Sequence, residues 1–123
     1  MEAVAGSSYH RTVRTGSVVI VALCAARASA DPAVADKLAA EAATKADHSD
    51  FPNAATKYRE AYAADPRPDF MCNVGIAYYK AKDLTRAERY LEQCEQIGKA
   101  LDAKFLDSVA KVHKAVNLSL IHI

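Results

Sequence analysis

The fold is decided by residues 51–97, which read FPNAATKYREAYAADPRPDFMCNVGIAYYKAKDLTRAERYLEQCEQI. This stretch, with the residue before it, aligns with itself at a shift of 33 residues. The aligned pairs are Asp50 with Asp83, Phe51 with Leu84, Ala54 with Ala87, Tyr58 with Leu91, and Ala61 with Cys94. A fixed period of this size is typical of stacked helix-turn-helix units. We therefore expect an all-α protein built from repeated helix hairpins.

The second unit carries the more complete motif. Met71, Val74, Gly75 and Tyr78 follow the spacing W-x2-L-G-x2-Y, and Ala87-x3-Leu91 comes after them. The first unit contributes Ala54-x3-Tyr58, Ala61 and Asp65-Pro66. These residues resemble the tetratricopeptide repeat (TPR) family. The resemblance implies a short right-handed stack of antiparallel helix hairpins within residues 31–98, with units at about 33–66 and 68–98.

Two departures from the TPR pattern are visible. The first unit has Glu41 and Lys45 where the motif has apolar and aromatic residues, and the second unit ends at Gly98-Lys99 without a proline. We therefore expect the first unit to be an atypical terminal repeat. The resemblance indicates a fold and a binding habit, but it does not name a partner.

Hydrophobic spacing and helix breakers predict five helices. The expected ranges are about 31–46, 51 to the stop at Asp65-Pro66-Arg67-Pro68, about 69–81, 84–97 and about 101–117. The predicted buried stripes are Met71, Val74, Gly75 and Tyr78 on the third helix, and Leu84, Ala87, Leu91 and Cys94 on the fourth. Glycine inside a helix is about 1 kcal/mol less favourable than alanine. We therefore expect the paired helix to approach closely at Gly75, and Gly75→Leu to destabilise far more than helix propensity alone predicts.

The end of the chain divides into two parts. Residues 99–117 repeat the motif weakly through Leu106, Val109, Ala110 and His113, so we expect a capping helix or a partial third repeat. Residues 118–123, LSLIHI, break the amphipathic pattern and match the translation of a common transposon-end sequencing adapter. Our hypothesis is that this tail is non-native and that the native protein continues beyond Asn117. The alternative is a genuine apolar tail.

The N-terminus has the pattern of a secretory signal peptide. Arg11 and Arg14 precede an apolar run at residues 18–26, and Ala28-Ser29-Ala30 is an A-x-A cleavage site. We expect residues 1–30 to be removed and the protein to be exported, to the periplasm or cell envelope. A run this short spans about half of a bilayer core as a helix, so no stable membrane span is expected in the mature chain. Lipidation at Cys24 is a less favoured alternative, because Leu23 precedes it.

Composition argues against several functions. The chain has 123 residues, 16 Lys+Arg and 15 Asp+Glu, so its formal charge of +1 gives no electrostatic case for nucleic-acid binding. His48 and His113 lack a metal-ligand spacing. No nucleophile-elbow serine and no glycine-rich phosphate loop occurs in the sequence. We expect no metal, no cofactor and no catalytic activity.

Cys72 and Cys94 form an ambiguous pair. Antiparallel helices joined near Asp83 bring the two residues level, in a compartment that we expect to be oxidising. A disulfide would close a loop of about 22 residues and stabilise the fold by about 3 kcal/mol. Against the bond, Cys94 lies on the predicted buried stripe while Cys72 lies beside it. Both a disulfide and two free buried thiols remain open.

The other face of the third helix is the candidate functional site. Asp69, Cys72, Ile76, Tyr79 and Lys80 point away from the stripe that meets the fourth helix. In the TPR family the first helices of successive units line a concave groove. The resemblance therefore implies a partner-binding groove lined by Asp69, Cys72, Asn73, Ile76, Tyr79 and Lys80, joined by Asp36, Ala39, Ala43 and Asp47. The alternative is that Ile76 and Tyr79 simply pack on the first helix.

We therefore expect a non-catalytic scaffold of the bacterial cell envelope that binds a protein or peptide. One alternative is that the chain is the N-terminal piece of a longer envelope enzyme or assembly factor that continues beyond Asn117. Another is self-association through the terminal helices, where Tyr90 and Ile97 could meet a second copy.

Overall fold

The computed structural model describes residues 29–122, and every regular element in this part of the chain is an α-helix. The helices are α2 (Pro32–Asp47), α3 (Phe51–Ala64), α4 (Pro68–Lys80), α5 (Leu84–Ile97) and α6 (Ala103–Ile121). The predicted all-α class is therefore confirmed. The predicted signal peptide, residues 1–30, lies outside the described residues except for Ser29 and Ala30.

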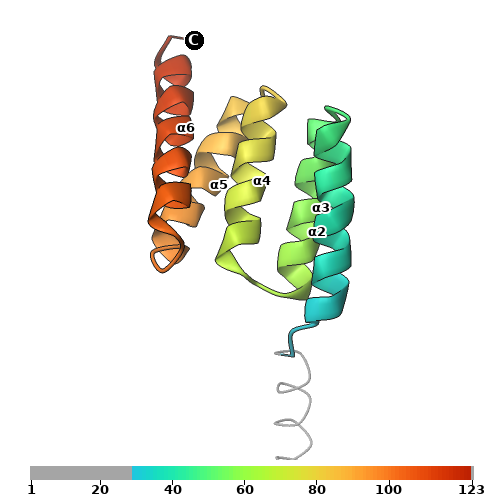
Figure 1. Cartoon of the computed structure of the whole chain (residues 1–123). Coiled ribbons are helices and arrows are strands. Elements are labelled where there is room, and N and C mark those ends of the chain that lie inside the picture. Colours follow the sequence, from blue (N-terminus) through green and yellow to red (C-terminus); the bar gives the residue numbers. More distant parts are fainter. Residues whose placement is uncertain (1–28, 123) are drawn as a thin grey trace, which may run out of the picture. The chain divides into compact units, whose positions relative to one another are not determined.

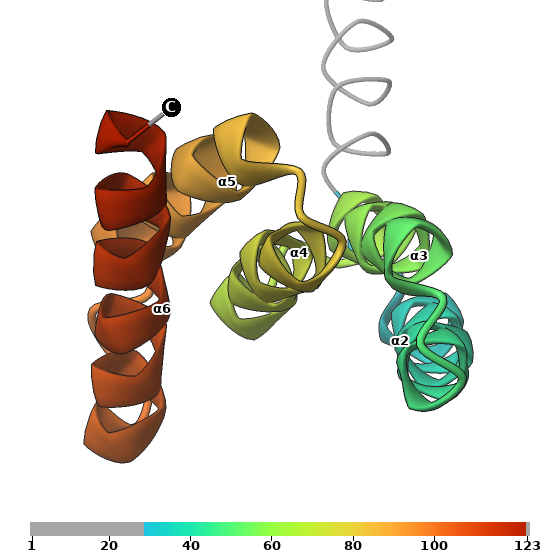
Figure 2. The ribbon, with the colours of Figure 1, turned by 90° about the horizontal axis from the view of Figure 1, so that it is seen from above.

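The helices pack as two hairpins followed by a single helix. α2 pairs with α3, α4 pairs with α5, and α6 lies along α5 (Figure 1). Seen from above, α3 and α5 lie on one side of the helical unit, and α2 and α4 lie on the other (Figure 2). α4 is the central helix, because it contacts α3, α5 and α6.

Aspartates and prolines mark where the helices begin. Asp31, Asp83 and Asp102 accept hydrogen bonds from the backbone amides of Val34, Arg86 and Phe105, which satisfies one of the free donors at each N-terminus. α2, α3 and α4 each have a proline in the first two positions, where its missing donor costs nothing. These local signals explain why the predicted helix starts agree with the structure to within about two residues.

The turns inside the two hairpins have the same geometry. Ser49 follows α2 and Lys82 follows α4, with φ angles of 60° and 67°. At each turn the next two amides bond back to the last helical turn: Ser49 to Ala46 and Asp50 to Lys45, and likewise Lys82 to Tyr79 and Asp83 to Tyr78. This is the Schellman arrangement. It recurs at the same 33-residue shift as the sequence pattern.

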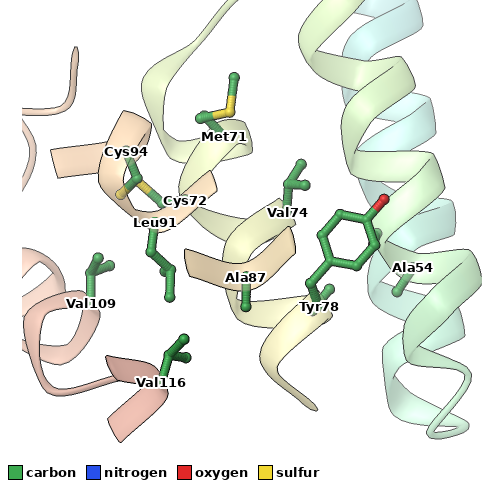
Figure 3. Close-up of a cluster of buried hydrophobic side chains, with 12 residues drawn as sticks. Ala54, Met71, Cys72, Val74, Tyr78, Ala87, Leu91, Cys94, Val109 and Val116 are labelled. Carbon is green, nitrogen blue, oxygen red and sulfur yellow. A yellow bond between two sulfur atoms is a disulfide. The ribbon is translucent and has the colours of Figure 1, made fainter. Parts of the chain in front are cut away.

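The main core cluster fills the space between α3, α4, α5 and α6 (Figure 3). Its buried members are Ala54, Ala55, Met71, Cys72, Val74, Ala77, Tyr78, Ala87, Leu91, Cys94, Val109 and Val116. The predicted stripe of α4 is fully buried, and on α5 only Leu84 remains partly exposed. A smaller second cluster, Ala35, Ala61 and Phe70, joins α2, α3 and α4.

Gly75 lies where α4 and α5 approach each other closely. A Cβ atom at this position would lie 2.8 Å from Cγ and Cδ2 of Leu91 and 3.1 Å from the Leu91 backbone nitrogen. The prediction of close approach is confirmed. The atoms that come close belong to Leu91, one turn beyond Ala87.

Cys72 and Cys94 form a disulfide bond between α4 and α5, with their Cα atoms 4.8 Å apart (Figure 3). This distance lies in the usual range for disulfides. The bond resolves the ambiguity left by the sequence. Close helix approach at Gly75 brings Cys72 within reach of Cys94, although Cys72 lies beside the main stripe.

α6 is longer than the sequence predicts. It ends at Ile121, so the predicted end at Asn117 is wrong. No glycine or proline follows Asn117, and Leu120 falls on the buried face of α6 and packs against the main core cluster. Leu118 and Ile121 are 50% and 74% exposed, so only part of the last turn contributes to packing.

Candidate partner-binding surface

α4 is buried on most of its circumference and open along one stripe. Its buried residues are Phe70, Met71, Cys72, Val74, Gly75, Ala77 and Tyr78. The positions left partly or fully exposed include five of the six predicted site residues: Asp69, Asn73, Ile76, Tyr79 and Lys80. Asp69, Asn73, Ile76 and Lys80 are spaced by three or four residues and share one helix face. We call these five residues the α4 stripe.

Cys72 does not belong to the α4 stripe. Its side chain is completely buried, and its sulfur is bonded to Cys94. The sequence assigned Cys72 to the open face by helical spacing alone. The close approach of α5 at Gly75 explains the error, because it extends the buried face of α4 as far as Cys72.

Arg67 connects α2 to the beginning of the α4 stripe. Its guanidinium donates to Asp36 of α2 at 3.0 Å and to Asp69 of α4 at 3.1 and 3.4 Å. It also lies 4.3 Å from the centre of the Phe70 ring. The hydrogen bond to Asp69 is the main cause of an Arg67 pKa above its usual value. The hydrogen bond to Asp36 and the charge of Asp36 raise this pKa by smaller amounts. Two predicted groove residues, Asp36 and Asp69, are therefore brought together by a cation.

The other predicted residues of α2 differ in environment. Ala39 is partly buried against the second cluster, while Ala43 and Asp47 are exposed. Asp47 acts on Tyr58 of α3: burial raises the pKa of the Tyr58 hydroxyl, and the charges of Asp47 and Asp69 raise it further. Of these three residues only Asp47 carries a charge, and the group on which it acts is Tyr58 of α3.

Ile76 and Tyr79 are the apolar members of the α4 stripe. Both are partly buried, and both pack against the main core cluster. Each side chain thus has one part in the core and one part at the surface. The alternative prediction placed both side chains on the first helix, whereas the buried members of the main core cluster lie on α3, α4, α5 and α6.

The stripe ends at a cavity of about 410 Å³ lined by Tyr79, Lys80, Lys82, Leu84 and Ser119. The Lys80 ammonium lies 5.6 Å from the centre of the Phe51 ring. Within residues 29–122, neither Lys80 nor Lys82 forms an ion pair with a carboxylate. The cavity therefore combines partly buried apolar side chains with two lysine cations that no carboxylate neutralises.

Sequence reasoning missed three parts of this surface. It left Lys82 between the third and fourth predicted helices, and it assigned Arg67 to a helix stop and Ser119 to a tail. Lys82 and Ser119 line the same cavity because the last turn of α6 lies near the α4–α5 turn. That proximity depends on how the helices pack. Only one of these contacts could have been predicted from the sequence. Arg67 stands two residues before Asp69, a spacing at which the guanidinium can reach the carboxylate.

A second, smaller cavity of about 190 Å³ is lined by Arg59, Tyr62, Met71, Val74 and Tyr90. Arg59 Nη1 donates to the Tyr78 hydroxyl at 3.4 Å, and this bond is the main cause of a raised Arg59 pKa. The rings of Tyr78 and Tyr90 stack with centroids 5.4 Å apart. The sequence analysis offered Tyr90 as a surface for self-association, but part of its ring already contacts Tyr78 of the same chain.

The described residues contain no group of three or more His, Cys, Asp or Glu side chains that could hold a metal ion. In the same part of the chain, every helix is too short or too polar to cross a membrane. No family model, curated protein or solved structure matches this sequence.

Proposed function

We propose that this chain is a TPR-like, non-catalytic scaffold of the cell envelope that binds an extended peptide or protein segment along the α4 stripe. The repeated 33-residue pattern and the two identical turns support the TPR-like part of the proposal. The signal-like N-terminus supports export. Binding by an open helix face is a common mode of peptide recognition.

The observation that carries the proposal is a rigid helix with one open stripe that leads to a cavity. α4 is fixed to α5 by the disulfide and by the contact between Gly75 and Leu91. A preorganised surface loses little conformational entropy when it binds. The partly exposed Ile76 and Tyr79 provide apolar contact area, and aromatic residues are enriched among residues that dominate binding energy.

The charges along the stripe define the chemistry of the partner. Lys80 and Lys82, which form no ion pair within residues 29–122, favour a carboxylate next to an apolar side chain. At the opposite end Asp36 and Asp69 share the single cation of Arg67, so this end keeps a formal charge of −1. The proposed ligand is therefore a segment with an apolar residue for Ile76 and Tyr79, and an acidic residue for the cavity.

The first experiment is a selection of binders from a library of random peptides, followed by affinity measurements with variants. Ile76→Ala should weaken binding of the selected peptides roughly tenfold, the usual loss for a residue that contributes about 1.4 kcal/mol. Ile97→Ala is the matched control, because Ile97 is 44% exposed on α5, away from the stripe. Asn73→Lys obstructs the stripe without touching the main core cluster and should also reduce affinity. The α4 assignment is wrong if Ile76→Ala and Ile97→Ala behave alike.

The second experiment tests the partner's charge. The selected peptides should be enriched in Asp and Glu, and their affinity should fall in the Lys80→Gln/Lys82→Gln double variant. Lys99→Gln/Lys104→Gln removes the same charge from exposed positions elsewhere and should change affinity little. Peptides that bind through Ile76 without acidic enrichment would contradict the proposed cavity chemistry alone. Failure to select any peptide would contradict the binding function itself.

A further inference from the structure

The smaller cavity lies on the side of α4 that faces away from the α4 stripe. Its floor is formed by Met71 and Val74 of α4, which are both buried (Figure 3). The helical period of 3.6 residues puts these two positions on the opposite side of α4 from the α4 stripe. Half-buried Tyr62 of α3 and Tyr90 of α5 line the same cavity. The cavity is therefore separate from the proposed peptide site, and its lining is largely apolar and aromatic.

Arg59 is the single charged residue among the described residues that line this cavity. Its side chain is exposed, and Nη1 donates to the Tyr78 hydroxyl at 3.4 Å. A guanidinium has five N–H donors, so this bond leaves four of them free. Within residues 29–122 Arg59 forms no ion pair with a carboxylate. A cation with free donors thus lies at the edge of an apolar cavity.

Two further arginines lie beside the tyrosine rings at this place. The Arg89 guanidinium is 5.4 Å from the centre of the Tyr90 ring, and the Arg86 guanidinium is 5.6 Å from the centre of the Tyr78 ring. Arg86 pairs with Asp83 at 3.5 Å, whereas Arg89 has no carboxylate partner in the described part of the chain. Positive charge therefore gathers around the cavity, and such a field raises the local concentration of anions.

The size of the cavity limits what it can hold. Its volume is about 190 Å³. Pockets for drug-sized molecules measure about 300–1,000 Å³, whereas an apolar cavity of about 150 Å³ holds one benzene ring. Aromatic walls favour an aromatic ring, through stacked or edge-to-face contacts with Tyr62 and Tyr90. One aromatic ring is thus the largest body that fits well.

We propose that this cavity binds a small carboxylate that carries one aromatic ring, with the ring over Met71 and Val74 and the carboxylate on Arg59. A guanidinium matches the planar carboxylate with two parallel hydrogen bonds. One lining cation also matches a single negative charge. This site is independent of the peptide site on the α4 stripe.

The test is an NMR titration of the isotope-labelled full chain with phenylacetate at about pH 7, where carboxylates are ionised. The dissociation constant should be on the order of 1 mM, the range expected for a ligand this small. Amide shift changes should centre on Tyr62, Met71, Val74 and Tyr90. Phenylacetamide has the same size and no charge, so it should bind several-fold more weakly, up to about tenfold.

Three variants separate the charge from the cavity. Arg59→Gln should reduce phenylacetate affinity to that of phenylacetamide and leave phenylacetamide unaffected. Lys114→Gln is the matched control, because it removes one positive charge from an exposed position on α6 and should change neither affinity. Tyr62→Leu removes an aromatic wall and should weaken both probes alike.

Three results would overturn the proposal. They are equal affinities of the wild type for the two probes, an Arg59→Gln variant that still prefers phenylacetate, and no shift change around the cavity at about 10 mM phenylacetate, tenfold above the expected dissociation constant. None of the variants alters the α4 stripe, so each of these results leaves the proposed peptide binding standing.

Discussion

Gly75 shows how one missing side chain sets the distance between two helices. A Cβ at this position would lie 2.8 Å from two Leu91 side-chain atoms, closer than packed carbon atoms tolerate. Gly75→Ala should therefore lower the free energy of unfolding by about 1–3 kcal/mol, although alanine is the better helix former. Urea denaturation measures the loss. In a chain that already carries Leu91→Ala, adding Gly75→Ala should lower the free energy of unfolding by less than it does in the wild type. Losses that simply add would contradict direct contact between the two positions.

Ser49 adopts a backbone conformation that favours glycine, with φ of 60°. Relief of the left-handed conformation is worth about 1 kcal/mol, and the added freedom of glycine in the unfolded chain offsets about half of it. Ser49→Gly should thus raise the free energy of unfolding by about 0.5 kcal/mol. Ser108→Gly is the control: Ser108 lies inside α6, where glycine should lower it by about the same amount. Loss of stability in both variants would refute the turn assignment.

At the residue level, the buried stripes could be predicted and the turn conformations could not. Met71, Val74 and Leu91 are apolar at helical spacing, so periodicity alone identifies them. Ser49 and Lys82 carry no such signal, because neither is a glycine or asparagine.

The disulfide joins α4 and α5 into one element. It closes a loop of 22 residues, and removing it should lower the free energy of unfolding by about 3 kcal/mol in the chain-entropy model. Mass spectrometry of unreduced, thiol-blocked protein should find a tryptic peptide containing Cys72 joined to one containing Cys94. Recovery of both cysteines in blocked form would show that the hairpin is held by packing alone.

The last turn of α6 contains a matched pair of leucines. Leu120 packs against the main core cluster, whereas Leu118 is 50% exposed. Leu120→Ala should therefore lower the free energy of unfolding by about 1 kcal/mol, and Leu118→Ala by less than about 0.5 kcal/mol. Thermal denaturation followed by circular dichroism compares the two. Equal effects would mean that the last turn does not pack as described.

Helix limits could be predicted where the chain has explicit start or stop residues. Asp31-Pro32 fixes the start of α2 to within about two residues, and Asp65-Pro66 fixes the last residue of α3 equally well. The end of α6 has no such residue, and the prediction there was wrong. The cavity beside Tyr79 could not be predicted, because it depends on the position of α6 relative to the α4–α5 turn.

The two hairpins repeat the hydrogen bonds of their turns as well as their sequence pattern. The turns at Ser49 and Lys82 match, and each hairpin meets the next helix through a polar pair, Arg59 with Tyr78 and Glu95 with His113. The two pairs do not occupy equivalent positions of the 33-residue repeat, because His113 aligns with Lys80 and Glu95 aligns with Tyr62. The repeat accounts for the matching turns, and the α4 stripe is where we propose function.

The most direct test of the central claim is a residue-by-residue NMR titration of the isotope-labelled chain with a selected peptide. Our account predicts that the largest amide shift changes occur along the α4 stripe, at Asn73, Ile76, Tyr79 and Lys80, and extend to Lys82. Shift changes concentrated on α3 and α5, with the α4 stripe unaffected, would contradict it.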